Sequence, residues 1–534
     1  MKPPIVMPTI PAAQRTALVE SLLSLIESLA QRVQKQEEDI AHLKDEIRVL
    51  KGQKGPPRFK PSKMDEKTEP RNAQQDQDKR RAGSEKRSKN AELVIHAEKV
   101  VQPTGGIPPG ARFKGYRDVV IQDLIIRAHN TRYRLARWLM PNGEFVTASL
   151  PTELAAHRYG VTLRSYLLHQ HHHCQVTQPL LLEQLREWGI DISSGAIDAL
   201  LSAGHEDFHA EKAALLQAGL ASAPYITVDD TGARHQGKNG YATQIGNPYF
   251  AWFESTMSKS RVNFLQLLCA GDIRYQINQA ALHSMREQGL PTIPVQALAM
   301  SIRQCLADSQ GWEVHLDTLG IQGERHRRIA TEGALLGELH QRGLSELAIV
   351  SDDAGQFDVL THGLCWIHSE RLIHTLLPLN EDHREDIAKV RSQVWQLYAD
   401  LKGYKQRPTQ KAKRALQRRF EEIFSQKTRY QGLNELLKRL RKNKAELLLV
   451  LERPEIPLHT NGSEGDIRDY VKKRKVSGGT RSDTGRQCRD TFASLKKTCR
   501  KLGISFWDYL NDRLTHAGRI LPLPFIVQFR ANNA

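Results

Sequence analysis

The sequence lacks the long apolar runs that would place it in a membrane or send it through one. No stretch of about 18 consecutive apolar residues occurs anywhere in the 534 positions. The first residues, MKPPIVMPTIPAAQRT, contain prolines and no continuous apolar segment, which argues against a secretory signal. We therefore expect a cytoplasmic protein.

Cysteine is scarce and unpaired along the chain, and this excludes two further classes. No CxxC pair occurs, so a thiolate zinc site is not expected, and the scattered pattern argues for a reducing compartment rather than a disulfide scaffold. The six cysteines are Cys174, Cys269, Cys305, Cys365, Cys488 and Cys499.

Positive charge is abundant and concentrated, within a formal net charge of +17. Residues 402–444 hold 15 Lys and Arg against three Asp and Glu, and residues 468–501 hold 12 against three. Residues 51–90 add 13 against six, so the rest of the chain is acidic overall. Concentrated cations indicate a polyanionic partner, and nucleic acid is favoured over a solvated basic face or an anionic membrane.

The N-terminal region carries a heptad pattern that predicts a parallel two-stranded coiled coil, with a helix packed on its own domain as the alternative. Its a and d positions are Leu22, Ile26, Leu29, Val33, Gln36, Ile40, Leu43, Ile47 and Leu50. Gln36 is the one polar residue among them and is expected to help fix the register. We therefore expect a homodimer or a higher oligomer.

The rest of the chain is predicted to be an α/β protein with appended modules. TQPLLLEQLREWGIDISSGAIDALL predicts two helices around a turn at Gly189, either a helix-turn-helix or a helical hairpin for packing alone. Adjacent histidines in HQHHHC point in different directions on a helix, which favours a polar helix end over a metal site. The predicted divisions are 13–52 coiled coil, 53–91 disordered basic linker, 92–156 small β-rich module, 157–220 helical region, 221–385 first catalytic part, 386–452 basic all-α insertion, 453–520 last catalytic part and 521–534 C-terminal tail.

Two apolar strands each end in a pair of aspartates. APYITVDD predicts a strand that ends in Asp229 and Asp230, and SELAIVSDD predicts another that ends in Asp352 and Asp353. One such pair means little, because Asp is common where strands turn into loops. Glu464, in NGSEGDI at the start of a predicted helix, is a third acid, and a first-turn carboxylate complementing the helix dipole is its ordinary role.

Together these acids form a set that suits divalent cations. Mg²⁺ prefers oxygen ligands, so carboxylates from separate elements can hold two ions about 4 Å apart. Such a pair activates the attacking oxygen and stabilises the leaving oxygen in phosphoryl displacement. The basic run after Glu464 would bring a phosphate backbone to the site.

Five motifs in order carry a resemblance that covers about residues 150–515. VDDTG, IVSDDAGQF, LCWIHSER, HTNGSEGDIR and SGGTRSDTGRQCRDTFASLKKTCRKLGISFWDYL resemble the DDE transposases of the IS-sixty-six-type insertion sequences. The resemblance implies an RNase H-like catalytic domain, a mixed sheet with helices, that uses Mg²⁺ in DNA strand cleavage and joining. The leading coiled coil is also typical of that group.

The resemblance assigns catalytic and metal-binding roles to three residues. They are Asp229, with Asp230 in place of the family's glutamate, Asp352, with Asp353 as the alternate, and Glu464. It also implies supporting roles for His368, Arg371 and Asn461, with a purely structural pair as the alternative for His368 and Arg371. Cys365 and Trp366 belong to the motif of His368 and Arg371, in which Arg371 stands one residue later than expected. We expect DNA contacts from Arg468, Lys472, Lys473, Arg474, Lys475, Arg481, Arg486 and Arg489.

The chain departs from the family pattern at two places. Gly465 and Asp466 stand where an arginine is expected, so phosphate contacts there will differ. The zinc-finger cysteines found near the start of many relatives are missing, which puts a zinc-dependent module in doubt.

The function implied is a bacterial, nucleoid-associated transposase that cuts element ends and transfers the 3′-hydroxyl into target DNA. Its cofactor would be two Mg²⁺ ions, with Mn²⁺ as a substitute, and its partner double-stranded DNA. The alternatives are an RNase H-like nuclease without strand transfer and a DNA-binding accessory protein whose carboxylates are inactive.

Overall fold

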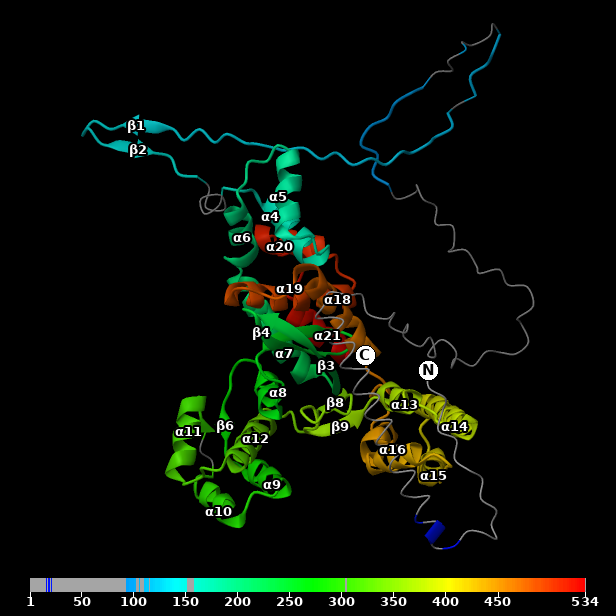
Figure 1. Ribbon diagram of the computed structural model, residues 1–534. Coiled ribbons are helices and arrows are strands. Elements are labelled where there is room, and N and C mark those ends of the chain that lie inside the picture. The colour runs from blue at the N-terminus through cyan, green and yellow to red at the C-terminus, as the bar shows by residue number, and fades with distance from the viewer. Residues whose placement is uncertain are drawn as a thin grey trace. The chain divides into compact units, whose positions relative to one another are not determined.

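The computed structural model in Figure 1 describes residues 93–101, 105, 110–114, 116–150, 158–302 and 305–533, with residues 16, 18, 19 and 21. Apart from those four positions, the predicted coiled coil and the predicted linker lie outside the described residues. The chain divides into two units, residues 56–131 and the remainder, and each is described by itself. None of the described helices is long and apolar enough to cross a bilayer.

The β-rich module predicted at 92–156 is largely absent from the described residues. Between 93 and 131 these residues form neither helix nor strand, and most of them are exposed. In the larger unit, β1 (Arg137–Leu139) and β2 (Phe145–Thr147) form a two-stranded hairpin around the expected Pro-Asn-Gly turn. The apolar residues before β1 pair with no strand among the described residues, and a sheet needs such partners to be stable.

A five-stranded mixed sheet is the centre of the larger unit. Its strand order is β5-β4-β3-β8-β9, with β3, β4 and β5 antiparallel and β3, β8 and β9 parallel. This mixed α/β architecture is consistent with the predicted RNase H-like domain. The strands are β3 (Tyr225–His235), β4 (Lys238–Gly246), β5 (Ala251–Thr256), β8 (Ala348–Ser351) and β9 (Thr361–Leu364).

The first aspartate pair does not end its strand, contrary to the sequence prediction. Strand β3 continues to His235, because its far half pairs with β4 all the way to the turn at Gln236 and Gly237. Its parallel partner β8 pairs only as far as Thr227. Asp229 and Asp230 therefore lie where the parallel pairing ends.

The helices that precede the sheet match the predicted helical region. They are α4 (Val161–Leu168), the π-helix η2 (His169–His173), α5 (Gln178–Glu187), α6 (Ser194–Ser202) and α7 (Glu206–Ser222). The turn between α5 and α6 contains Gly189 at φ +75°, and the Ser193 hydroxyl accepts a bond from the Ala196 amide as the N-cap of α6.

The segment between β5 and β8 is mainly helical, as predicted. Its elements are α8 (Arg261–Leu268), β6 (Tyr275–Gln276), α9 (Gln279–Glu287), α10 (Thr292–Met300), β7 (Cys305–Leu306), α11 (Ser309–Thr318) and α12 (Glu324–Gln341). Their apolar faces join those of α4–α7 in one core, which covers the face of β3 that carries Ile226 and Val228.

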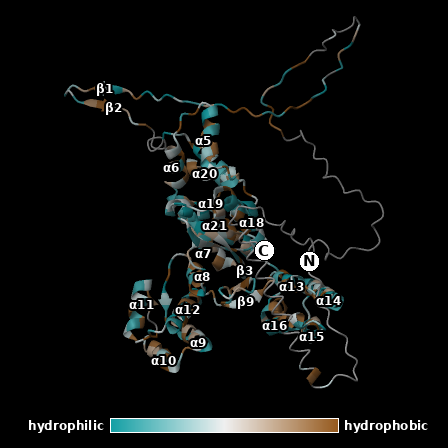
Figure 2. Cartoon of the chain, viewed as in Figure 1, coloured by the Kyte–Doolittle hydropathy of each residue, from teal (hydrophilic) through white to brown (hydrophobic). Residues whose placement is uncertain are grey.

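A second core lies beyond β9, where the all-α insertion was predicted. It packs β8, β9 and α13 (Trp366–His374) against the helices that follow. These helices mix hydrophilic and hydrophobic residues along their length, as Figure 2 shows for α15 and α16, so they bury one face and expose a basic one. The helices are α14 (Glu381–Gln406), α15 (Gln410–Ser425), α16 (Gln431–Lys442), α17 (Lys444–Leu447) and η3 (Leu449–Leu451).

Four helices close the chain: α18 (Asn461–Ser477), α19 (Asp483–Lys501), α20 (Phe506–Thr515) and α21 (Leu523–Asn532). Helix α19 covers the edge strand β5, whose amides donate to Asp490, Ser494 and Thr498 at four-residue intervals. The predicted C-terminal tail is instead helix α21, because Leu523 and Val527 are buried in the main core.

Candidate active site

Asp229 and Asp352 meet at the end of the parallel strand pair. Thr227 of β3 is paired with Val350 of β8, so two residues later Asp229 is level with Asp352, which directly follows β8. The pKa of Asp229 is raised to about 7, mainly by burial and further by the charges of Asp352 and Asp230. The backbone amide of Asp230 donates to Asp229 Oδ1 at 2.8 Å and partly offsets this rise.

The two aspartates of β3 point to opposite faces of the sheet, because successive strand residues alternate. Asp230 shares its face with Val228 and accepts a bond from Gln356 Nε2 at 2.7 Å, with Lys259 Nζ at 3.9 Å. Its pKa is raised by burial, although Lys259 and Gln356 work against that rise. Asp230 is thus already held by chain partners.

The second aspartate pair divides in a similar way. Asp352 Oδ1 accepts a hydrogen bond from the Ala354 amide at 3.3 Å. Its charge raises the pKa of both Asp229 and Asp230. The neighbouring Asp353 is exposed and pairs with Arg439 of α16, while Asn443 donates to it at 3.4 Å. Asp352 therefore faces the β3 acids, and Asp353 faces the all-α insertion.

Glu464 lies in the first turn of α18 and is bound by the two predicted supporting residues of α13. His368 Nε2 and Arg371 Nη2 each lie 3.4 Å from the same oxygen, Glu464 Oε1. Burial would lower the pKa of His368, but Cys365 and Glu464 raise it overall. His368 also acts electrostatically on Asp229, so it links the third acid to the first.

The start of α18 is fastened to the same face of β3 that carries Asp229. The hydroxyls of Thr227 and Ser463 are 2.7 Å apart, both residues are buried, and Thr227 also donates to the Gly246 carbonyl. Farther along, Arg474 donates to the Gly232 carbonyl and to Thr231 Oγ1. Alternation along β3 thus aims Thr227, Asp229 and Thr231 at α18.

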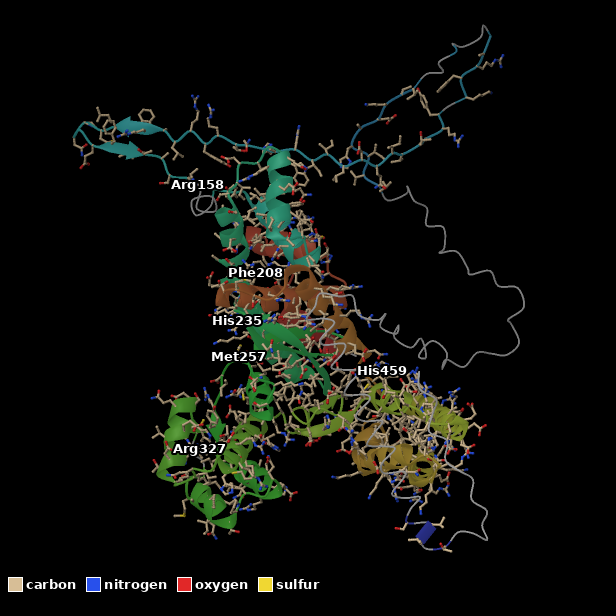
Figure 3. The ribbon with its side chains drawn as sticks, in the orientation of Figure 1. Arg158, Phe208, His235, Met257, Arg327 and His459 are labelled. Atoms are coloured by element: carbon tan, nitrogen blue, oxygen red, sulfur yellow. The ribbon has the colours of Figure 1, made fainter. Side chains whose placement is uncertain are left out.

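Three further motif residues lie at the starts of α13 and α18. Cys365 is buried at the N-terminus of α13, and Trp366 donates its indole N–H to the Leu447 carbonyl at 2.9 Å, within the second core. Asn461 begins α18 and is exposed, with its amide donating to His459 Nδ1. Figure 3 draws these side chains and labels His459, just before the helix.

Among the residues that the structure describes, no three His, Cys, Asp or Glu side chains are set as a ready metal-ligand group. Asp229 and Asp352 are a facing pair, whereas Glu464 is occupied by His368 and Arg371. The donor chemistry nonetheless fits a hard divalent cation, because no described Lys, Arg or His forms an ion pair with Asp229 or Asp352 and because the pKa of Asp229 is raised.

The eight residues predicted to contact DNA divide into exposed and occupied groups. Arg468, Lys475 and Arg481 are exposed. Lys472 and Arg486 pair with the acids Asp469 and Asp483 on their own helices. The other three are Arg474, which is bound to β3, Lys473, which is half-buried, and Arg489, which is only 7% exposed.

Sequence reasoning missed the groups that hold the acids in place. Gln356 at Asp230 and Ser463 beneath Glu464 lie inside quoted motifs but were given no role, and their partners Lys259 and Thr227 lie outside those motifs. Alternation along β3 was the one available signal, because it places Thr227 on the face of Asp229.

Comparison with known proteins gives two matches. Residues 347–488, which include Asp352, His368 and Glu464, match the model of a family described as "Transposase IS66 family". The chain is also similar to "Uncharacterized protein y4jO" of Sinorhizobium fredii, with 44% identity over 321 residues. That alignment covers 59% of this chain and the whole of the other protein.

Proposed function

Because the chain belongs to the IS66 family of transposases, we propose that it cuts DNA at the ends of a mobile element and joins them to target DNA. Water attacks a phosphodiester and breaks its P–O3′ bond, which leaves a 3′-hydroxyl and a 5′-phosphate. The 3′-hydroxyl then attacks a target phosphodiester, so that one P–O bond forms as another breaks. Positioning and charge stabilisation supply the acceleration, without a covalent protein–DNA intermediate.

The observation that carries the proposal is the pairing of two acids from distant segments, with a third acid related to them through His368. Asp229 and Asp352 face each other across β3 and β8, and His368 connects Asp229 electrostatically to Glu464. Burying Asp229 beside another carboxylate destabilises the folded protein, so this arrangement is not explained by stability. Such costs are typical of functional sites.

We assign the metal-binding role to Asp229 and Asp352, with Glu464 as the third ligand. When bound, divalent ions supply charge stabilisation for phosphoryl displacement. The chain's own residues do the rest: Gln356 and Lys259 hold Asp230, and the Thr227–Ser463 contact fixes the start of α18. His368 and Arg371 hold Glu464 on the side of β3.

DNA would reach this site past the exposed cations of α18 and the following loop. Arg468 and Lys475 are exposed on α18, and Arg481 follows it. The basic faces of α15 and α16 extend the positive surface. The dimer expected from the coiled coil would bring two element ends together, and this part of the proposal rests on the sequence alone.

A strand-transfer assay with Mg²⁺ tests the proposal and separates it from the two alternatives. Wild type is compared with Asp229→Asn and Glu464→Gln, using labelled element-end DNA and a target plasmid. Joined products that both substitutions abolish support a transposase. Cleaved products without joining identify a nuclease, and DNA binding without either product identifies an accessory protein. Both variants should keep DNA binding, since the cationic segments are unchanged.

A further inference from the structure

Four cations line a partly buried pocket that η2, α18 and α19 enclose, and three of them, all but Lys497, have no carboxylate within ion-pair distance among the described residues. Lys473 comes from α18, and Arg489 and Lys496 come from α19. Arg489 is only 7% exposed, and Lys473 and Lys496 are partly buried. His172 of η2 and Phe253 of β5 complete the wall on the remaining sides.

Three buried polar atoms of this pocket are not satisfied by the described part of the chain. Arg489 Nε and Nη2 have no hydrogen-bond partner among these residues, and neither has His172 Nε2. The Arg489 guanidinium lies over the Tyr470 ring, 4.7 Å from its centroid, which holds it in place without satisfying its N–H groups. A buried donor without an acceptor costs about 1–3 kcal/mol, and more when charged.

The three cations also lack a carboxylate of their own among the described residues. Lys473 and Lys496 donate to the carbonyls of His171 and His172, at 2.8 and 3.2 Å, and Lys473 Nζ also lies 3.3 and 3.4 Å from the ring nitrogens of His171. Burial, with repulsion from Arg489 and Lys496, lowers the pKa of Lys473 to about 7. Burial likewise lowers the pKa of Lys496 to about 8, while Asp469 opposes that change.

The two acids that line the pocket are bound by other lysines. Asp469 pairs with Lys497 at 2.6 Å and with Lys472 at 3.5 Å. Asp466 pairs with Lys501 at 3.0 Å and with Lys497 at 3.6 Å. The pocket therefore keeps an excess of positive charge, directed at an empty centre.

We propose that a phosphate group binds at the mouth of this pocket, whose enclosed space of about 20 Å³ admits one of its oxygens, with Arg489 donating from its free N–H groups and Lys473 and Lys496 completing the contacts. A tetrahedral oxyanion accepts several charge-assisted hydrogen bonds at once, which is what the unsatisfied donors require. An open cleft of about 720 Å³, which shares Asp469, Lys496 and Lys497 with the pocket, gives access from solvent.

The phosphate site is separate from the carboxylate site, although both border α18. Lys473 follows Glu464 by nine residues, which corresponds to about half a turn of rotation and roughly 13 Å along the helix. The phosphate can come from a DNA backbone or from free phosphate. Only the first source rests on the proposed function, whereas the site itself does not.

Thermal unfolding of the full chain with inorganic phosphate tests the site without any activity measurement. We expect saturable stabilisation of wild type by phosphate but not by chloride at equal ionic strength. Lys473→Gln and Arg489→Gln should weaken phosphate binding about tenfold or more, as expected for loss of a charged hydrogen bond. The matched control is Lys475→Gln, an exposed lysine of the same helix, which should respond as wild type does.

A further readout separates a ligand site from a structural role. Without phosphate, Lys473→Gln should unfold at the same temperature as wild type or higher, because one of three repelling charges is gone. An equal phosphate response in Lys473→Gln and Lys475→Gln would overturn the proposal, as would equal effects of chloride and phosphate. If Arg489→Gln does not fold, Lys473→Gln and Lys496→Gln decide the outcome.

Competition identifies the source of the phosphate. Inorganic phosphate is titrated into a complex with labelled duplex at constant ionic strength. Displacement by phosphate in wild type, and weaker displacement in Lys473→Gln, assigns the pocket to the DNA backbone. Stabilisation by phosphate without displacement assigns it to free phosphate. If the strand-transfer assay fails while phosphate still binds, the proposed function falls and this site remains.

Discussion

Helix α18 borders two clusters of like charge that the chain treats differently. Toward β3 and α13, Asp229 and Asp352 face each other, while the chain supplies His368 and Arg371 to hold Glu464 and Lys259 to hold Asp230. Toward η2 and α19, Lys473, Arg489 and Lys496 gather without a carboxylate in ion-pair contact among the described residues, although Asp469 lies near Lys496. Glu464 and Asp230 have direct partners of opposite charge, and these three cations do not.

The difference shows what each cluster can bind. Partial compensation keeps an acidic site folded without a metal ion and leaves Asp229 and Asp352 able to accept a divalent cation. Uncompensated cations with unsatisfied N–H groups require a stronger acceptor than water. One helix thus presents a cation site near its start and an anion site near its end, about two and a half turns apart and on opposite faces.

The largest expected effect tests which acid of the second pair belongs to the acidic cluster. Asp352→Asn should lower strand cleavage on the order of 10³-fold, the scale seen when one charge-stabilising group is removed from an active site. Asp353→Asn should stay within about tenfold of wild type by the same measure, because its partners are Arg439 and Asn443. Cleavage of labelled element ends under single-turnover conditions measures both.

Two comparisons keep this result interpretable. Circular dichroism and DNA affinity should be unchanged in both variants, since neither residue belongs to a core. The reverse ranking, with Asp353→Asn the more damaging, would move the site toward the all-α insertion and contradict the assignment of Asp352.

The next effect is the pH dependence of divalent-ion binding by the acidic cluster. The pKa of Asp229 is about 7 in the folded protein, raised from 3.8, so protons compete with the metal ion below pH 7. The apparent affinity for Mg²⁺ should fall up to about tenfold per pH unit there, followed as Mg²⁺-induced thermal stabilisation relative to EDTA. Asp229→Asn should remove both the stabilisation and its pH dependence.

Asp229 should also make the stability of the metal-free protein depend on pH. Between pH 3.8 and about 7 the folded state binds more protons at Asp229 than the unfolded state does, so this contribution to stability is lost as pH rises. Asp229→Asn should therefore stabilise the metal-free protein at pH 8 relative to wild type. Destabilisation there would show that the Asp229 carboxylate is paired in the fold.

Much of the sheet could be predicted from the sequence, because apolar runs and turn residues are local signals. The strands before the two aspartate pairs, the hairpin at Asn247 and the helices around Gly189 all follow from local pattern. The length of β3 could not be predicted, since its far half is set by pairing with β4. The helical end at Leu523 was missed because its burial depends on a distant core.

The sequence predicts which acidic residues belong to the candidate site and their order along the chain. It does not predict which side chains bind to them. The sequence places Glu464 after the aspartates, yet only the fold brings His368 and Arg371 to one of its oxygens. The positive charge of residues 468–501 led us to expect that Arg489 lies on the surface and contacts DNA. The apolar spacing of Cys488, Phe492 and Leu495 was a signal that this face of α19 is buried.

The cationic cluster should respond to pH in the opposite direction from the acidic one. The pKa of Lys473 is lowered from 10.5 to about 7, so above pH 7 the unfolded state binds more protons than the folded state. This contribution makes the phosphate-free protein more stable as pH rises from about 7, by on the order of 1–2 kcal/mol after allowance for partial exposure. Lys473→Gln should flatten the slope in urea unfolding, and Lys475→Gln should not.

The smallest expected effect concerns Arg371, which acts on the acidic cluster through Glu464. Its side chain is 47% exposed and 3.4 Å from Glu464 Oε1, so solvent weakens the pair and the loss should be modest. Arg371→Gln should lower the cleavage rate about threefold and leave KM for DNA unchanged, with partial recovery in Arg371→Lys. A change confined to KM would instead mean that Arg371 holds DNA. Because His368 contacts the same oxygen, His368→Gln combined with Arg371→Gln should cost more than the two single losses predict, since either residue alone still keeps Glu464 beside β3.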